Sequence, residues 1–140
     1  MAVVFYNRTI IEEVCGLLSD VSDNVYPEHR PLASTDQAED LVVVDISSWM
    51  KCYRAYQKGV MRITVFAKDR AKGQANTVRL QELVDGITAK LPIVRERYTV
   101  YMPAGSSLRM RGSDGLGYTY WRLDLDLQVN TIDSYASYNV

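Results

Sequence analysis

The stretch Val60–Leu91 changes its hydrophobic period once, and this change constrains the fold more than any other feature of the sequence. In Val60–Ala67 the apolar residues stand at every second position, which predicts a strand with one buried face. After the basic segment Lys68–Gly73 they recur at helical spacing, and Pro92 ends the run. The helical set is Leu80, Leu83, Val84, Ile87 and Leu91. The sequence therefore predicts a strand, a basic loop and an amphipathic helix that lies on the apolar face of that strand.

A second helix is predicted near the N-terminus, starting at Thr9 and ending near Ser19 or Asp20. The Thr9 hydroxyl can cap this helix while Glu12 completes a capping box. Its expected buried stripe consists of Ile11, Val14, Cys15 and Leu18. This helix supplies a second apolar surface for the sheet.

Several further strands are expected from β-branched runs and alternating patterns. Leu41–Ile46 reads as a strand that is covered on both faces and pairs antiparallel with the strand from Val60. Trp121–Asn130 alternates most cleanly and predicts a central strand with one face on the helices. Three more strands are predicted at Asn24–Tyr26, Ile93–Met102 and Ser107–Arg111. In the second of these, Val94, Tyr98, Val100 and Met102 lie on one face. A surface loop is predicted at 28–40 and a glycine-rich turn at 112–117.

The predicted fold class is α+β, with a mostly antiparallel sheet of about five to six strands and two helices on one face. A chain of 140 residues is most simply one domain, which we place at residues 1–130. Residues 131–140 are rich in Ser, Tyr and Asn, which predicts an exposed, flexible tail.

Composition is ordinary for a globular protein, with 47% hydrophobic and 24% charged residues. No apolar run approaches the roughly 20 residues that span a bilayer, and the N-terminal residues lack the pattern of a secretion signal. Intracellular synthesis is therefore expected, with Cys15 and Cys52 reduced and structural.

Charge is distributed unevenly along the chain, although the net charge is −1. Residues 1–50 carry 2 basic and 9 acidic side chains (net −7), and residues 51–72 carry 7 basic and 1 acidic (net +6). Residues 112–140 carry 1 basic and 4 acidic (net −3). Two interpretations fit: scattered solvated faces, or complementary patches that meet when copies of the protein pack together.

The segment 47–59 joins two predicted strands and is too long for a tight hairpin. Its aromatic residues alternate with basic ones: Trp49, Tyr53 and Tyr56 with Lys51, Arg54 and Lys58. Three interpretations remain open: a helical turn or strand extension packed on its own domain, a contact arm onto a neighbouring subunit, or a nucleic-acid surface.

Catalytic patterns are weak. Asp124 and Asp126 point the same way on one strand and, with Asp45, have the composition of a cation site, but alternation with leucines is also how any half-exposed strand looks. His29 is the only histidine and has no triad context. The glycine-rich turn precedes a strand, where a phosphate loop would precede a helix. We predict a protein that is not an enzyme and needs no cofactor or metal.

The order of elements resembles the tail terminator or tail-completion proteins, and related minor neck proteins, of long-tailed bacteriophages. The matching features are a first helix leading to Asn24-Val25-Tyr26-Pro27, the strand Met61–Ala67, and a helix after Gly73-Gln74-Ala75. The long 47–59 segment and the Ser/Tyr tail depart from the pattern. The resemblance implies a virion subunit that caps the tail tube as a ring, expected to be a hexamer, and forms the interface to the neck or head.

The implied partners are other copies of the chain, the tail tube protein and a neck or head-completion protein, with DNA passing through unbound and no membrane involved. The candidate subunit or tube contacts are Trp49, Lys51, Tyr53, Arg54, Tyr56, Lys58, Arg62, Lys68, Arg70 and Lys72. Asp124, Asp126 and Asp133 are candidates for an acidic partner or channel surface. The alternatives are a small α+β module that binds a ligand or nucleic acid as a dimer, and a metal-dependent hydrolase.

Overall fold

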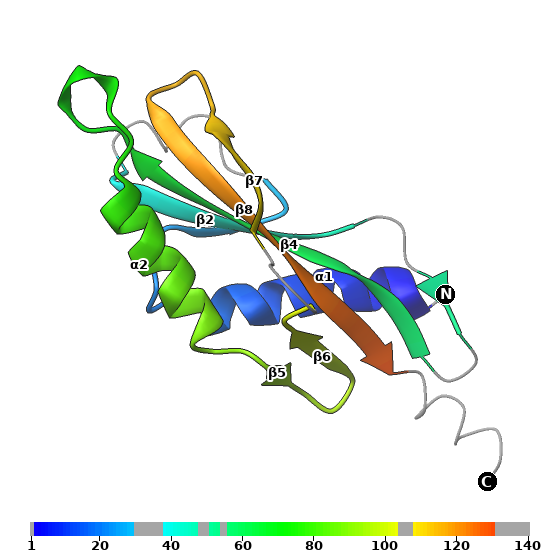
Figure 1. Cartoon of the computed structure of the whole chain (residues 1–140). Helices are drawn as coiled ribbons and strands as arrows, with labels where there is room; N and C mark the ends of the chain where they lie inside the picture. Colours follow the sequence, from blue (N-terminus) through cyan, green and yellow to red (C-terminus); the bar gives the residue numbers. More distant parts are fainter. Residues whose placement is uncertain (1, 30–37, 48–50, 54–55, 104–107, 131–140) are drawn as a thin grey trace, which may run out of the picture.

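The computed structural model describes the backbone of residues 2–29, 38–47, 51–53, 56–103 and 108–130, and the side chains of these residues except 2–7 and 108–111. Within these ranges the chain forms two α-helices and a single, strongly twisted sheet of eight strands (Figure 1). The predicted α+β class, with two helices and a mostly antiparallel sheet, is confirmed.

Two long central strands organise the sheet. β4 (Tyr56–Lys68) and β8 (Tyr118–Asn130) pair antiparallel along their whole length, from Tyr56 opposite Asn130 to Lys68 opposite Tyr118. Thirteen residues at about 3.3 Å each make a ladder about 43 Å long. β4 therefore starts four residues before the predicted Val60, and the predicted central place of the last strand is confirmed.

The other strands add to the two edges of this ladder. β2 (Asp40–Ile46) pairs with β4 from Met61 onward, and β3 (Lys51–Cys52) pairs with the start of β4 on the same edge. β7 (Leu108–Ser113) and β6 (Tyr98–Tyr101) share the free edge of β8 in the same way. The sheet is completed by β1 (Val25–Pro27), parallel to β2, and by β5 (Ile93–Val94), antiparallel to β6.

The sheet therefore contains eight described strands where five to six were predicted. The excess has a physical reason: β4 and β8 are long enough for two short strands to pair in sequence along one edge. The turn between β7 and β8 is where the glycine-rich turn was predicted, and Gly115 and Gly117 adopt the positive φ that glycine tolerates.

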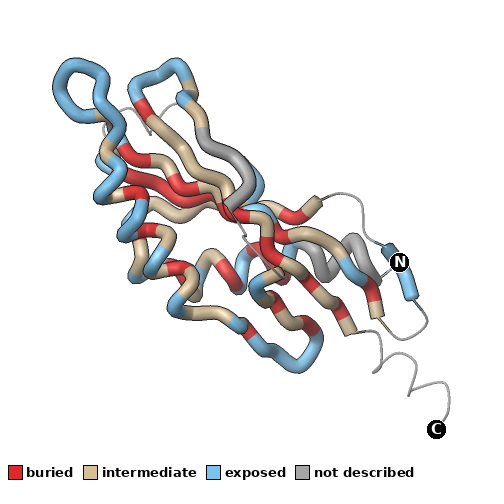
Figure 2. The backbone as a smooth tube through the Cα atoms, viewed as in Figure 1, coloured by how far each residue is buried: buried red, intermediate tan, exposed pale blue. Residues whose placement is uncertain are grey.

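Both helices contribute to one hydrophobic core. α1 (Ala2–Leu17) and the residue after it bury Ile10, Ile11, Val14 and Leu18, and α2 (Thr77–Thr88) buries Leu80, Leu83 and Ile87. These side chains form one cluster with the inward-facing residues of β2, β4 and β8, so both helices lie on the same face of the sheet (Figure 2). The inward strand residues are Val42, Val44, Ile46, Met61, Ile63, Val65, Ala67, Leu123, Leu125, Leu127 and Val129.

The predicted start of the first helix is wrong. α1 begins at Ala2, so Thr9 and Glu12 lie inside the helix and form no capping box. Glu12 instead forms an ion pair with Arg8 one turn earlier, with 2.7 Å between Glu12 Oε1 and Arg8 Nε. The helix extends to Ala2 because no proline or glycine interrupts the first eight residues. Cys15, predicted to be buried, is half-buried at the edge of the core.

The prediction of one strand over Ile93–Met102 is also wrong. This segment is a small hairpin, β5–β6, whose turn is closed by the Arg95 amide donating to the Tyr98 carbonyl at 2.8 Å. The turn consists of three adjacent charged residues, 95–97, which interrupt the alternation and stay in solvent. Tyr98 and Val100 are buried as predicted, whereas Val94 and Met102 are 63% and 44% exposed.

A smaller cluster covers the opposite face of the sheet near the start of β2. Leu41, Val43 and Tyr118 are buried there, with Tyr26 and Phe66 packed beside them. Leu41 to Val44 of β2 are all buried, so the prediction that this strand is covered on both faces is confirmed.

Candidate functional site

An aromatic and basic hairpin forms one end of the molecule. Lys51 pairs with Lys58 across β3 and β4, and the Tyr53 amide donates to the Tyr56 carbonyl at 2.8 Å. The two tyrosine rings stack, with centroids 4.8 Å apart, and the Lys51 ammonium lies 5.5 Å from the Tyr53 centroid. Of the predicted contact residues in 47–59, these four are therefore brought together, whereas Trp49 and Arg54 lie outside the described residues.

These four side chains share one face of the hairpin. Residues two apart on a strand point the same way, so Lys51 and Tyr53 lie on one side with their partners Lys58 and Tyr56. Cys52 and Gln57 point to the other side. We call Lys51, Tyr53, Tyr56 and Lys58 the Tyr–Lys face. Because Tyr53 is 41% exposed and both lysines are exposed, this face combines aromatic rings and cations at the surface of the single chain.

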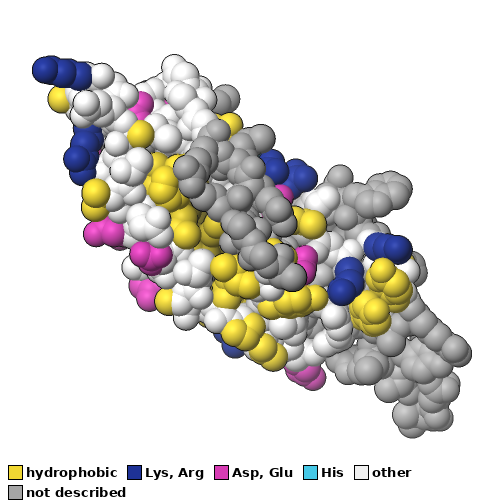
Figure 3. Space-filling view, in the orientation of Figure 1, with side chains coloured by type: hydrophobic (Ala, Val, Ile, Leu, Met, Phe, Trp, Pro, Cys, Tyr) yellow, Lys and Arg dark blue, Asp and Glu magenta, His cyan; other side chains and the backbone are white. Residues whose placement is uncertain are grey.

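The basic loop lies at the other end of β4. Lys68, Arg70 and Lys72 are all exposed there, at the tip drawn at the upper left in Figure 1. Backbone contacts hold the base of this loop: the Lys68 amide donates to the Glu39 carbonyl at 2.9 Å, and the Asp69 amide to that of Gly117 at 2.8 Å. Apart from Arg62 in the middle of β4, the predicted basic residues that the structure describes therefore lie in two sets at the two ends of this strand. Figure 3 shows Lys and Arg side chains toward both ends of the molecule.

Charged residues form a row across the middle of the open sheet face. Arg62 lies directly between Asp45 on β2 and Asp124 on β8 in the strand register. Asp124 also pairs with Arg122, whose Nε lies 3.2 Å from its Oδ1. Asp126 is half-buried, opposite Val60. Opposite charges that face each other across strands stabilise a sheet, which is a structural role for this row.

The cation-site alternative at Asp45, Asp124 and Asp126, which the sequence disfavours, is not assembled in this register. Asp45 and Asp124 are separated by the whole width of β4, and Arg62 occupies the position between them. Asp45 instead accepts a hydrogen bond from the Ile46 amide at 2.8 Å. Within the described ranges, no group of three His, Cys, Asp or Glu side chains could hold a metal ion. Asp133 lies outside the described residues.

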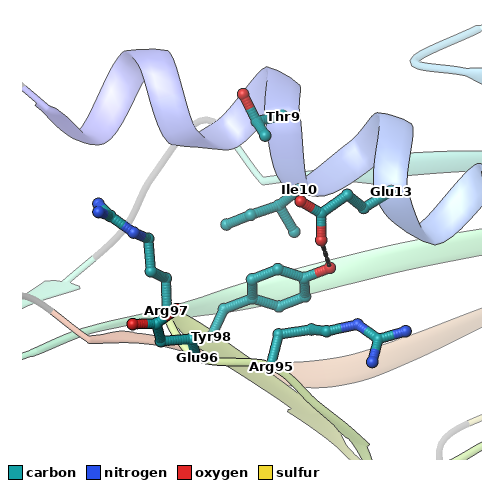
Figure 4. Close-up of a pocket in the computed structure, with 7 residues that line it drawn as sticks. All are labelled: Thr9, Ile10, Glu13, Arg95, Glu96, Arg97 and Tyr98. Carbon is teal, nitrogen blue, oxygen red and sulfur yellow. Dashed lines mark hydrogen bonds between the residues drawn. The ribbon is translucent and has the colours of Figure 1, made fainter.

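A groove of about 370 Å³ lies between α1 and the β5–β6 turn (Figure 4). At its floor the Tyr98 hydroxyl donates to Glu13 Oε1 at 2.8 Å, and Thr9, Ile10, Arg95, Glu96 and Arg97 complete its walls. Burial, followed by the Glu13 hydrogen bond, raises the pKa of Tyr98 well above its ordinary value. A phenol that holds its proton so firmly is a poor base and nucleophile. The hydrogen bond between Tyr98 and Glu13 connects the sheet to α1.

A buried polar cluster fastens α2 to the start of β2. Arg79 Nε lies 2.7 Å from Asp40 Oδ2, while the Ser22 hydroxyl donates to the other carboxylate oxygen. The Asn24 amide group donates to the Asp40 carbonyl at 3.1 Å. The hydrogen bond to Asp40 raises the pKa of Arg79, so the guanidinium stays protonated. Sequence patterns gave no signal for this cluster, since its members come from three separate segments.

No protein-family model and no curated protein matches this chain. Neither helix in the described part of the chain is long and apolar enough to cross a membrane.

Proposed function

We propose that this chain is a structural subunit of a long-tailed bacteriophage that caps the tail tube as a ring, expected to be a hexamer. The observation that carries the proposal is the long β4–β8 ladder with the Tyr–Lys face at one end and the basic loop at the other. A subunit of a closed ring needs two different surfaces that complement each other, since each copy contacts its neighbours head to tail. A rigid ladder holds two different surfaces at a fixed separation, so that each can serve a different contact of the ring.

The mechanism is geometric. One face of the ring binds the last ring of the tail tube, and the other face presents a different surface, so that no further tube subunit adds. Neck or head-completion protein then docks on the outward face. In this proposal the Tyr–Lys face serves contacts between subunits, and Lys68, Arg70 and Lys72 serve contacts with the tube.

The proposal is tested by mixing the purified chain with polymerising tail tube protein from the same virus. Addition at a few copies per tube end should shorten the tubes, and electron microscopy should show a ring at one tip. A variant in which Lys68, Arg70 and Lys72 are all replaced by Ser should fold and form rings but cap poorly. Tubes that grow to the same length with and without the protein would rule out the capping function.

A nucleic-acid binding module is the second candidate, favoured by one observation. The Tyr–Lys face combines exposed aromatic rings with cations, as single-strand binding surfaces do. In that case Tyr53→Ser should weaken binding of a fluorescent single-stranded oligonucleotide, and the affinity should fall steeply with salt. The capping proposal expects no measurable binding to the oligonucleotide at physiological salt.

A further inference from the structure

A shallow groove with an acidic rim lies on the outer side of α2, far from the hairpin. It is lined by Thr77, Val78, Gln81, Glu82, Asp85 and Trp121. Val78 is 59% exposed although it is apolar, and Trp121 from β8 contributes a half-buried ring beside it. We call this surface the α2 groove. It offers an apolar floor and two carboxylates, and no basic residue lines it.

The two carboxylates of the α2 groove are only weakly engaged within the subunit. Glu82 lies 3.5 Å from Arg79 Nη1 and its side chain is 60% exposed, while Asp85 accepts a hydrogen bond from the Gln81 amide at 2.8 Å. Both groups can therefore meet an incoming cation without losing a strong internal ion pair. Acidic side chains along α2 are visible in Figure 3, at the opposite end from the lysines beside β3.

The chemistry of the Tyr–Lys face complements that of the α2 groove. The stacked tyrosines need an apolar surface, which Val78 and Trp121 supply, and the two lysines need carboxylates. The groove beside Pro92 is lined by Lys90 and Arg95 and has no acidic residue, so it would repel the hairpin. The groove beside Tyr98 has two acidic and two basic residues and offers the lysines no net attraction. A further groove around Asp40 is acidic but mainly polar, and Arg79 lies in it.

The hairpin cannot reach the α2 groove of its own subunit. Trp121 pairs with Val65, which lies nine residues after Tyr56 on β4. At about 3.3 Å per residue the two surfaces are roughly 30 Å apart along the ladder. They also lie on opposite faces of the sheet, since Trp121 packs with the helices on the inner face, and Tyr56 has the opposite parity on β4. Contact between them therefore requires two copies of the chain.

We propose that the Tyr–Lys face of one copy docks in the α2 groove of the next copy. This inference rests on the proposed ring and names the contact that builds it. Tyr53 and Tyr56 cover Val78 and Trp121, and Lys51 and Lys58 approach Glu82 and Asp85. The interface is heterologous because it joins two different surfaces, so repeating it produces a closed ring or an open filament.

The contact is tested by disulfide trapping in a Cys52→Ser background. Lys51→Cys combined with Glu82→Cys should give, on mild oxidation, a ladder of covalent multimers that ends at the size of the ring. The matched control combines Lys51→Cys with Val94→Cys, whose side chain is equally accessible but lies on β5. The control should remain a monomer on a non-reducing denaturing gel. Rings that form without cross-links through Glu82→Cys, or that cross-link equally through Val94→Cys, would overturn this contact and leave the ring proposal intact.

Charge reversal gives an independent measurement. Glu82→Lys with Asp85→Lys, or Lys51→Glu with Lys58→Glu, should raise the concentration at half-assembly about tenfold or more, because like charges then face each other. Mixing the two double variants should restore alternating contacts, and combining all four changes in one chain should restore the ring. If each variant assembles like the unaltered protein, the docking proposal is wrong. If the unaltered protein stays monomeric at all concentrations, both the contact and the ring fail.

Discussion

Replacement of Arg79 by Leu should destabilise the protein substantially, because it leaves the Asp40 carboxylate without its cation. The Asp40 side chain is 12% exposed and accepts Arg79 Nε at 2.7 Å, and the Arg79 Nη2 also donates to the Val21 carbonyl at 3.3 Å. The pair therefore joins α2 to β2 and to the segment after α1. Water cannot replace Arg79 fully at so little exposure.

The magnitude follows from burial. Removing one partner of a fully buried ion pair costs about 3–5 kcal/mol, whereas exposed pairs contribute about 0–1 kcal/mol. The Arg79 side chain is 34% exposed, so we expect the loss of unfolding free energy to be about 2–3 kcal/mol. Asp40→Asn should cost about 1–2 kcal/mol, and the double variant should cost less than the sum, with a coupling energy of about 1–2 kcal/mol.

The assay is urea unfolding followed by far-ultraviolet circular dichroism, with Arg70→Leu as the matched control. Arg70 is exposed and its side chain donates to Asn76 Oδ1 at 3.2 Å, so its loss should change the unfolding free energy by less than about 0.5 kcal/mol. The view that this cluster fixes α2 on the sheet would be refuted if Arg79→Leu lowered the unfolding free energy by less than about 1 kcal/mol. It would also be refuted if the losses for Arg79→Leu and Asp40→Asn added up fully in the double variant.

Three other perturbations test separate parts of the structure. Burial raises the pKa of the Cys15 thiol to about 11, so in Cys52→Ser at pH 8 iodoacetamide should label native Cys15 about two hundred-fold more slowly than urea-unfolded protein; equal rates would show an accessible thiolate. Tyr98→Phe should lower the unfolding free energy by about 1 kcal/mol near neutral pH. Because the pKa of Tyr98 is raised in the folded protein, the stability that its hydroxyl contributes is complete below about pH 10 and is lost as the pH rises further. If the Phe variant lost as much stability as the unaltered protein at alkaline pH, Tyr98 would not be the group responsible. Leu83→Ala should lower the unfolding free energy by about 2–5 kcal/mol, and Val78→Ala on the same helix by less than about 0.5 kcal/mol. Similar losses for the two variants would contradict the burial of Leu83 and the exposure of Val78.

The long elements were predictable because each has one buried face with a regular period. Met61, Ile63 and Val65 alternate with Arg62 and Thr64 in the middle of the pairing with β8, so this part of the strand follows from side-chain geometry alone. The same holds for the α2 stripe that begins at Leu80. The two-residue strands β3 and β5 carry no such period, because a strand of that length shows at most one alternation.

Errors arose where a local pattern had a second meaning. Thr9 and Glu12 match a capping box, but the helix passes through both because nothing before them stops it. The alternation after Pro92 predicts one strand, but the charged residues 95–97 interrupt it and form a turn.

The contacts that hold the molecule together were missed for a different reason. Glu13 and Tyr98 are 85 residues apart and Asp40 and Arg79 are 39 apart, so local periodicity carries no information on either pair. For the hairpin, the alternation of aromatic and basic residues drew attention to the segment in which Lys51, Tyr53, Tyr56 and Lys58 lie together, and their role in contacts stays a prediction. Their shared face depends on the register between β3 and β4, which only the structure shows.

The central claim is that copies of this chain assemble head to tail into a closed ring. Native mass spectrometry of the purified protein over a range of concentrations tests it most directly, with Lys51→Glu/Lys58→Glu as the control that removes the attraction of the Tyr–Lys face. We predict a single closed species, expected to contain six copies, that the control lacks. A protein that stays monomeric, or a dimer that the control forms equally well, would contradict the account.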